Sequence, residues 1–141
     1  MPQLDAYLFF NGNCADAMRF YERTLGGKIE MMLTHADSPM GTQASPGNAN
    51  RIMHASILID GRILMASDSM AGQPYEGMNG FSLSLLYPSV AEAQKIFDAL
   101  AKGGQVRMPM EKTFWAESFG MLVDSFGTPW MISGPQTKFE S

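Results

Sequence analysis

The chain has few of the residues on which many binding sites depend. It contains one cysteine, Cys14, and two histidines among 141 residues. A single cysteine excludes a disulfide within the chain and is typical of the reducing cytoplasm, where we expect this protein to be found. We interpret Cys14 as a small buried residue at the start of a helix, although a helix N-terminus can lower the pKa of a thiol.

Runs of like charge and long apolar runs are also missing. The formal net charge is −4, and the 10 Lys and Arg residues are scattered along the chain. Because no basic patch stands out, we expect no nucleic-acid partner. No apolar run approaches the length of a membrane span and no secretory signal is present, so we expect no membrane partner. The glycines form no nucleotide-binding loop, which leaves nucleotide cofactors and S-adenosylmethionine without support.

The sequence does contain one pattern that occurs twice. The segments 13–27 (NCADAMRFYERTLGG) and 89–104 (SVAEAQKIFDALAKGG) both follow a strand pattern and end in a glycine pair. Each has apolar residues at helical spacing, and Asn13 and Ser89 are expected N-caps. Strand patterns follow both segments, and both series finish with a glycine turn and a similar strand.

This repeat predicts an α+β fold made of two βαβββ modules. We expect a single domain over residues 1–141, with module one at about 3–70 and module two at about 80–135. The expected strands are 4–10, 28–34, 52–59, 63–68, 81–87, 105–110, 120–124 and 129–133. A chain built from two such units usually has its site between them, so residues at equivalent places are the first candidates for chemistry.

The two modules differ in one long loop. The offset between equivalent residues is 77 at Gly26 and Gly103 but 66 at Gly61 and Gly127. Module one therefore carries about eleven extra residues, which the Pro- and Gly-rich loop at 35–50 supplies. This loop is either a lid or subunit contact, or a disordered insertion.

Four strings, in order, resemble one known superfamily. NGNCADAMRFYERTLGG, ILMASD, TFWAESFG and DSFGTPWMI resemble the vicinal oxygen chelate superfamily, which includes glyoxalases, bleomycin-resistance proteins and dioxygenases, and in particular its PhnB-like branch. The resemblance covers about residues 7–134. It implies a glyoxalase-like fold, with curled mixed sheets around a cavity, and a homodimer.

The resemblance also implies where a metal would bind. Metal-using members carry a His or Glu on the first and last strand of each module, and these four ligands hold a divalent ion that acts as a Lewis acid. Spacing carries these positions to Ala6, Met65, Ser82 and Met131. None of the four suits a hard divalent ion, because thioethers prefer soft ions and a serine hydroxyl is a poor neutral ligand. We therefore expect no metal or other cofactor, with a displaced divalent metal as the alternative.

The remaining candidates are polar or aromatic residues near these positions. Alternation along 52–59 places His54 on the face opposite Ala55, where it is either a general acid or base or a histidine hydrogen-bonded within the sheet. Asp68 either binds a cationic or hydroxylated ligand or is a turn residue that caps local backbone N–H groups. The expected ligand cavity is lined by Ala6, Met65, Ser67, Ser82, Trp115, Phe119 and Met131.

Two functions follow from these residues. The first is a metal-independent protein of the bleomycin-resistance kind, whose cavity binds a small, partly apolar molecule. The 13 methionines fit this function, because methionine makes soft, adaptable surfaces. The second is a divergent lyase, isomerase or dioxygenase that uses a displaced divalent metal, or His54 as acid or base. The sequence does not decide whether the protein is an enzyme.

Overall fold

The computed structural model describes residues 1–39 and 47–137. The chain falls into two compact units, Met1–Gly77 and Met78–Ser141. Each unit contains one helix and one four-stranded mixed sheet in the chain order βαβββ. The α+β class and the two βαβββ modules predicted from the repeat are therefore confirmed. None of the helices in the described part of the chain is long and apolar enough to cross a membrane.

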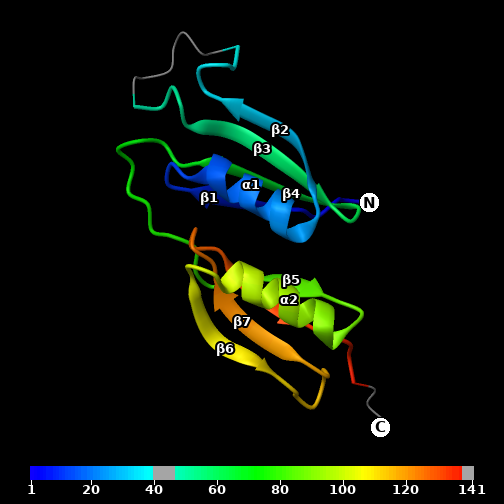
Figure 1. Ribbon diagram of the computed structural model, residues 1–141. Helices are drawn as coiled ribbons and strands as arrows, with labels where there is room; N and C mark the ends of the chain where they lie inside the picture. The colour runs from blue at the N-terminus through cyan, green and yellow to red at the C-terminus, as the bar shows by residue number, and fades with distance from the viewer. Residues whose placement is uncertain (40–46, 138–141) are drawn as a thin grey trace. The chain divides into compact units, whose positions relative to one another are not determined.

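The first unit places its helix against one face of its sheet (Figure 1). Its elements are β1 (Ala6–Phe10), α1 (Cys14–Leu25), β2 (Lys28–Thr34), β3 (Ile52–Ile59) and β4 (Arg62–Asp68). The strand order is β1-β4-β3-β2, in which β1 and β4 are parallel and the other neighbours are antiparallel.

The second unit repeats this topology. Its elements are β5 (Leu83–Leu86), α2 (Val90–Ala101), β6 (Gln105–Glu111), β7 (Phe119–Val123) and β8 (Pro129–Ser133). The strand order is β5-β8-β7-β6, again with the first pair parallel. Each sheet is open, because its first and last strands are edges.

The core of each unit lies between the helix and one face of the sheet. In the first unit α1 contacts β3, β2 and β4. Strand residues alternate, so every second side chain points toward the helix and is buried. The buried strand residues of the first unit are Leu8, Phe10, Ile52, Ala55, Ile57, Leu64, Ala66, Ser67 and Asp68. All of these except Ile52 and Ser67 belong to the alternating set on the helix side.

The two glycines that follow each helix have different structural roles, and these roles are the same in both units. Gly26 and Gly103 have φ of 72° and 76°, a left-handed conformation that costs a residue with a Cβ atom more than it costs glycine. The second glycine has a different role, because the sheet approaches it closely. A Cβ on Gly27 would lie 2.9 Å from the Leu58 carbonyl oxygen, and one on Gly104 would lie 2.2 Å from the Val123 carbonyl oxygen.

A buried carboxylate ties three separate segments of the first unit together. Asp68 Oδ1 accepts hydrogen bonds from the backbone N–H groups of Gly12 at 2.9 Å and Cys14 at 3.0 Å, and its Oδ2 accepts one from Ile52 at 2.8 Å. Asp68 therefore caps backbone N–H groups, but the expectation that they are local is wrong, because the partners lie 56, 54 and 16 residues away in the chain. Asn13, predicted to cap α1 with its side chain, makes no such bond. The Asp68 carboxylate binds the N–H groups on either side of Asn13.

The second unit has a carboxylate with the same function at a different place. Asp124 Oδ1 accepts from the N–H groups of Phe126 at 2.9 Å and Thr128 at 3.0 Å, and its Oδ2 accepts from the indole N–H of Trp130 at 2.8 Å. Asp124 is only 3% exposed. It therefore fixes the turn between β7 and β8 and the orientation of the largest buried side chain. At α2 the predicted cap is present, because Ser89 Oγ accepts from Glu92 N–H at 3.1 Å.

Replacing the two glycines of the second pair should destabilise the protein unequally. Gly103→Ala adds a Cβ at a left-handed residue and should cost about 1 kcal/mol of unfolding free energy. Gly104→Ala forces the Cβ against backbone that cannot swing away, and should cost about 2–3 kcal/mol. Urea denaturation followed by circular dichroism measures both. Equal losses would show that the close approach at Gly104 is not a constraint.

Asp68→Ala should destabilise the protein more than any surface charge deletion. It leaves two buried N–H groups and one partly buried N–H group without their acceptor, and we expect a loss of roughly 3 kcal/mol or more. Asp16→Ala is the matched control, because that side chain is 78% exposed on α1 and faces Arg19 at 4.0 Å. The control should change the free energy of unfolding by less than about 0.5 kcal/mol. Similar urea midpoints for the two variants would refute this role of Asp68.

Candidate functional site

The first unit leaves one face of its sheet without a helix. We call the side opposite α1 the helix-free face. The strand pairing aligns Tyr7 with Met65, Met65 with Ser56, and Ser56 with Met31. Residues paired across neighbouring strands project from the same face of a sheet. These four side chains therefore form one row on the helix-free face, from β1 at one edge to β2 at the other.

The second unit carries an equivalent row. Ser84 pairs with Met131, Met131 with Met121, and Met121 with Met108. The two ends of this row, Ser84 and Met108, each lie 77 residues after their counterparts Tyr7 and Met31, which is the offset of the glycine pairs. The repeat thus extends from the helices to the register of the sheets.

Ala6 and Met65, which spacing had assigned to one site, lie on opposite faces of the sheet. Ala6 pairs with Leu64 and lies in step with Leu8, on the helix side of the sheet. The residue of β1 that shares a face with Met65 is Tyr7, one position later. A shift of one residue along a strand moves a side chain to the other face, so the carried-over position is displaced. Ser82 precedes β5 and is in step with Ser84, on the side of Met131.

His54 lies on the helix-free face and has a partner that the sequence interpretation missed. The Tyr7 hydroxyl lies 3.1 Å from His54 Nδ1, and the two ring centroids are 5.6 Å apart. Tyr7 is on the edge strand β1, and β4 lies between it and His54 on β3. Ala55 pairs with Ala66, and continuing this register by one residue puts Ser67 beside His54. Met65 and Ser67 therefore lie on the strand that the Tyr7–His54 contact crosses.

One signal could have identified Tyr7. Tyr7 and Phe9 alternate with buried Leu8, yet they are 39% and 56% exposed. Large aromatic side chains on the outward positions of a strand are unusual unless another surface or a ligand uses them. The rings of Tyr7 and Phe9 also contact each other, with centroids 5.2 Å apart.

The aromatic residues of the second unit form a chain of edge contacts. Trp115 packs edge-to-face against Phe114 at 4.8 Å and against Phe119 at 5.3 Å. Phe119 is two residues before Met121, so it lies on the same side of β7 as the row. The structure thus brings Trp115 and Phe119 to the side of Met131. Trp130, the neighbour of Met131 in sequence, alternates to the other face of β8, is 2% exposed and donates to Asp124.

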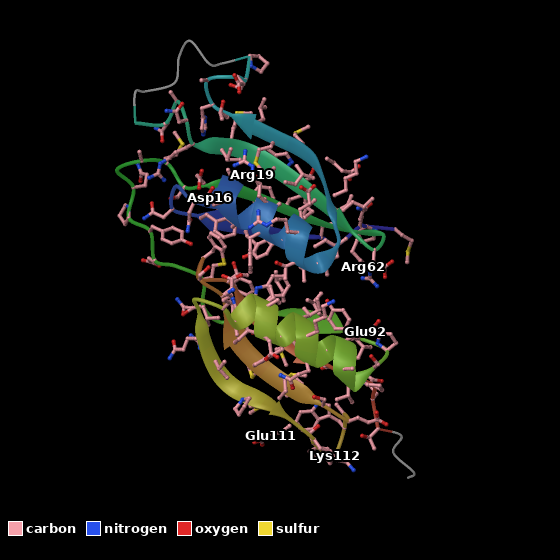
Figure 2. All side chains as sticks on the ribbon, in the orientation of Figure 1. Asp16, Arg19, Arg62, Glu92, Glu111 and Lys112 are labelled. Atoms are coloured by element: carbon pink, nitrogen blue, oxygen red, sulfur yellow. The ribbon has the colours of Figure 1, made fainter. Side chains whose placement is uncertain are left out.

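Hard-metal ligands are scarce where the family positions fall. Within residues 1–39 and 47–137, no three His, Cys, Asp or Glu side chains gather closely enough to hold a metal ion. Figure 2 labels six charged side chains, which come from helix surfaces or strand ends: Asp16, Arg19, Arg62, Glu92, Glu111 and Lys112.

Cys14 is unsuited to act as a nucleophile. The side chain is fully buried. Burial raises the pKa of its thiol to about 12, and the nearby Asp68 charge acts in the same direction. The thiol therefore stays protonated at neutral pH, when only the thiolate is reactive.

The long loop at 35–50 is only partly described, because residues 40–46 lie outside the described residues. Its two ends are joined by backbone hydrogen bonds. His35 N–H donates to the Arg51 carbonyl at 3.0 Å, and Ala36 N–H donates to the Ala49 carbonyl at 2.9 Å. Asn48 Oδ1 also accepts from Ala71 N–H at 2.7 Å. The bond between Asn48 and Ala71 attaches the base of the loop to the segment after β4.

Comparison with known proteins identifies relatives along nearly the whole chain. The model of the Glyoxalase/Bleomycin resistance protein/Dioxygenase superfamily matches residues 3–132. Protein YjdN of Escherichia coli (strain K12) is 38% identical, and the match covers 94% of this chain and 95% of YjdN.

Solved structures agree with this match. Protein PA1353 from Pseudomonas aeruginosa is 46% identical, with a TM-score of 0.89, over 97% of this chain and 100% of that protein. The PhnB protein from Bacillus cereus has a TM-score of 0.80 at 23% identity, over 94% of this chain and 99% of that protein, a likeness of fold. The expected glyoxalase-like fold is confirmed, and the chain belongs to the glyoxalase/bleomycin resistance protein/dioxygenase superfamily.

Proposed function

We propose that this protein binds a small, partly apolar molecule on the helix-free faces of its sheets, without the divalent metal that many members of its superfamily use. One observation carries the proposal. The row across the first sheet contains Tyr, Met, Ser and Met, and the row across the second contains Ser and three Met. None of these side chains is a carboxylate or an imidazole, the groups that hard divalent ions prefer.

The exposure of these faces supports binding of an apolar group. Phe9 is 56% exposed, Met31 48% and Met108 43%. Exposed apolar side chains of this size mark contact surfaces more often than chance, and methionine adapts its shape to irregular ligands. Ser67 and Ser82 supply hydroxyl groups, which can orient such a ligand by hydrogen bonding.

The residues that we assign to binding come from both units. The first unit contributes Met65 and Ser67 beside the Tyr7–His54 contact. The second unit contributes Met131, Ser82, Trp115 and Phe119. Ala6, on the helix side, supports the strand and is replaced by Tyr7 in the binding role. We further propose that the protein is a cytoplasmic homodimer, as its single cysteine and its family suggest.

Polar substitution at the centre of each row should weaken binding. The fluorescent probe 1-anilinonaphthalene-8-sulfonate should bind saturably, and Met65→Gln or Met131→Gln should each weaken its affinity about tenfold, because apolar contact is lost. Met70→Gln is the control, since Met70 is 48% exposed but lies beyond β4. Fluorescence titration in the presence and absence of EDTA measures the affinities.

Two results would overturn the proposal. One is stoichiometric metal in the purified protein, found by elemental analysis and lost in Ser82→Ala or His54→Ala. The other is an affinity for the probe that falls when EDTA is added. Equal affinity of the Met65, Met131 and Met70 variants would show that the probe binds elsewhere.

The hydrogen bond between Tyr7 and His54 favours a second candidate function, acid–base catalysis. A histidine held by a hydroxyl on a partly exposed face can take or give a proton near neutral pH. The reaction would be that of a lyase or an isomerase, in which a proton leaves a carbon next to a carbonyl.

Proton exchange provides a direct measurement of this second function. If His54 is the base, the protein should accelerate exchange of solvent deuterium into hydroxyacetone, followed by NMR. His54→Ala should lower the rate by about a hundredfold or more. His35→Ala is the matched control, because it removes the other histidine and leaves the helix-free face intact. Equal rates for the two variants would exclude His54 as the base.

A further inference from the structure

A hydrogen bond on the helix-free face of the first unit joins two side chains from strands that are not neighbours. Tyr7 extends from edge strand β1 over β4 to reach His54 Nδ1 on β3 at 3.1 Å. A side chain that spans an intervening strand occupies surface that a shorter residue would leave open. Tyr7 is 39% exposed, so its hydroxyl contact lies at the surface of the sheet, within reach of a ligand.

The surroundings of this pair are uncharged. The strand residues next to it by register are Phe9, Leu33, Ser56, Met65 and Ser67. An oxyanion placed against the pair would therefore meet no carboxylate among these five side chains. Apolar neighbours also weaken competition from water, which strengthens hydrogen bonds to an ion.

The hydrogen bond to Tyr7 occupies Nδ1 of the His54 ring. The other ring nitrogen, Nε2, is left to contact a ligand. In a neutral histidine one nitrogen is a donor and the other is an acceptor. When Nδ1–H donates to the Tyr7 oxygen, Nε2 is a base and the Tyr7 O–H is a free donor. The pair then offers a proton acceptor at Nε2, while Tyr7 holds the ring through Nδ1.

We propose that Tyr7 and His54 act as one unit that binds a small unsaturated or aromatic molecule through an acidic hydroxyl group, a phenol or an enol. The O–H bond of the ligand breaks and an N–H bond forms at Nε2. The products are an imidazolium, which still donates from Nδ1 to the Tyr7 oxygen, and a ligand oxyanion, which accepts from Nε2–H. The apolar body of the ligand contacts Phe9 and Met65. This inference rests on the proposed small-molecule function and specifies its ligand class.

The probe that tests it is 4-nitrophenol, whose ionisation changes its visible absorbance. 4-Nitroanisole, which lacks the acidic hydroxyl, is the matched neutral probe. The protein should bind 4-nitrophenol as its anion, so that the absorbance of the anion rises on titration below the pH at which the free probe ionises. Tyr7→Phe should weaken this binding by about tenfold or more, since it removes the hydrogen bond that the imidazolium donates from Nδ1. His54→Gln should abolish the absorbance change.

Both variants should still bind 4-nitroanisole, with a loss of affinity much smaller than the loss for 4-nitrophenol, which also shows that they fold. Tyr87→Phe, which deletes a hydroxyl in the second unit, should change neither probe. A second measurement uses ¹⁵N NMR of the histidine rings, of which the chain has two. The Nδ1 signal of His54 should move in Tyr7→Phe, while that of His35 should not.

The outcomes separate the two proposals. Unchanged ionisation of 4-nitrophenol in Tyr7→Phe, or an unmoved His54 signal, overturns the role of Tyr7 while 4-nitroanisole binding still supports the small-molecule function. Binding of 4-nitrophenol only in its neutral form overturns proton transfer. Failure of the unaltered protein to bind either probe overturns both the inference and the proposed function.

Discussion

A carboxylate that is removed from water must find hydrogen-bond donors, and this requirement organises each unit. Asp68 accepts hydrogen bonds from N–H groups of the β1–α1 connection and of the start of β3. It thereby fixes where α1 begins and where the long loop ends. Asp124 accepts hydrogen bonds from N–H groups of the turn before β8 and from the indole of Trp130. Because one side chain holds three partners, the segments around it are positioned together and the sheet register follows.

The position of the helix then determines which face of each sheet is free for binding. Burial against α1 commits Leu8, Ala55 and Ala66 to the core, and alternation sends Tyr7, Ser56 and Met65 to the other side. The same logic applies to Leu122 and Met121 in the second unit. The positions that we propose for binding are therefore ones that the core does not use, which leaves them free to change without loss of the fold.

Local periodicity predicted the elements well, because helices, strands and turns depend on neighbours in sequence. The strands 28–34, 52–59 and 129–133 were predicted with the observed bounds. Contacts between distant residues were not predictable in this way. The side-chain cap expected from Asn13 is replaced by Asp68, and the position carried to Ala6 belongs to Tyr7. Both differences arise from pairing between β1 and β4, which no short stretch of sequence encodes. The roles of the candidate site residues remain predictions.

The hydrogen bonds at the base of the 35–50 loop have a consequence for how the protein can vary. The bonds from His35 to Arg51 and from Ala36 to Ala49 close the loop before it reaches the sheet. A loop closed at its base can gain or lose residues at its tip while β2 and β3 stay in register. This explains how the first unit accommodates its extra residues while the rows of the two sheets still correspond. It also makes the loop tip a permissive position for inserting a reporter peptide.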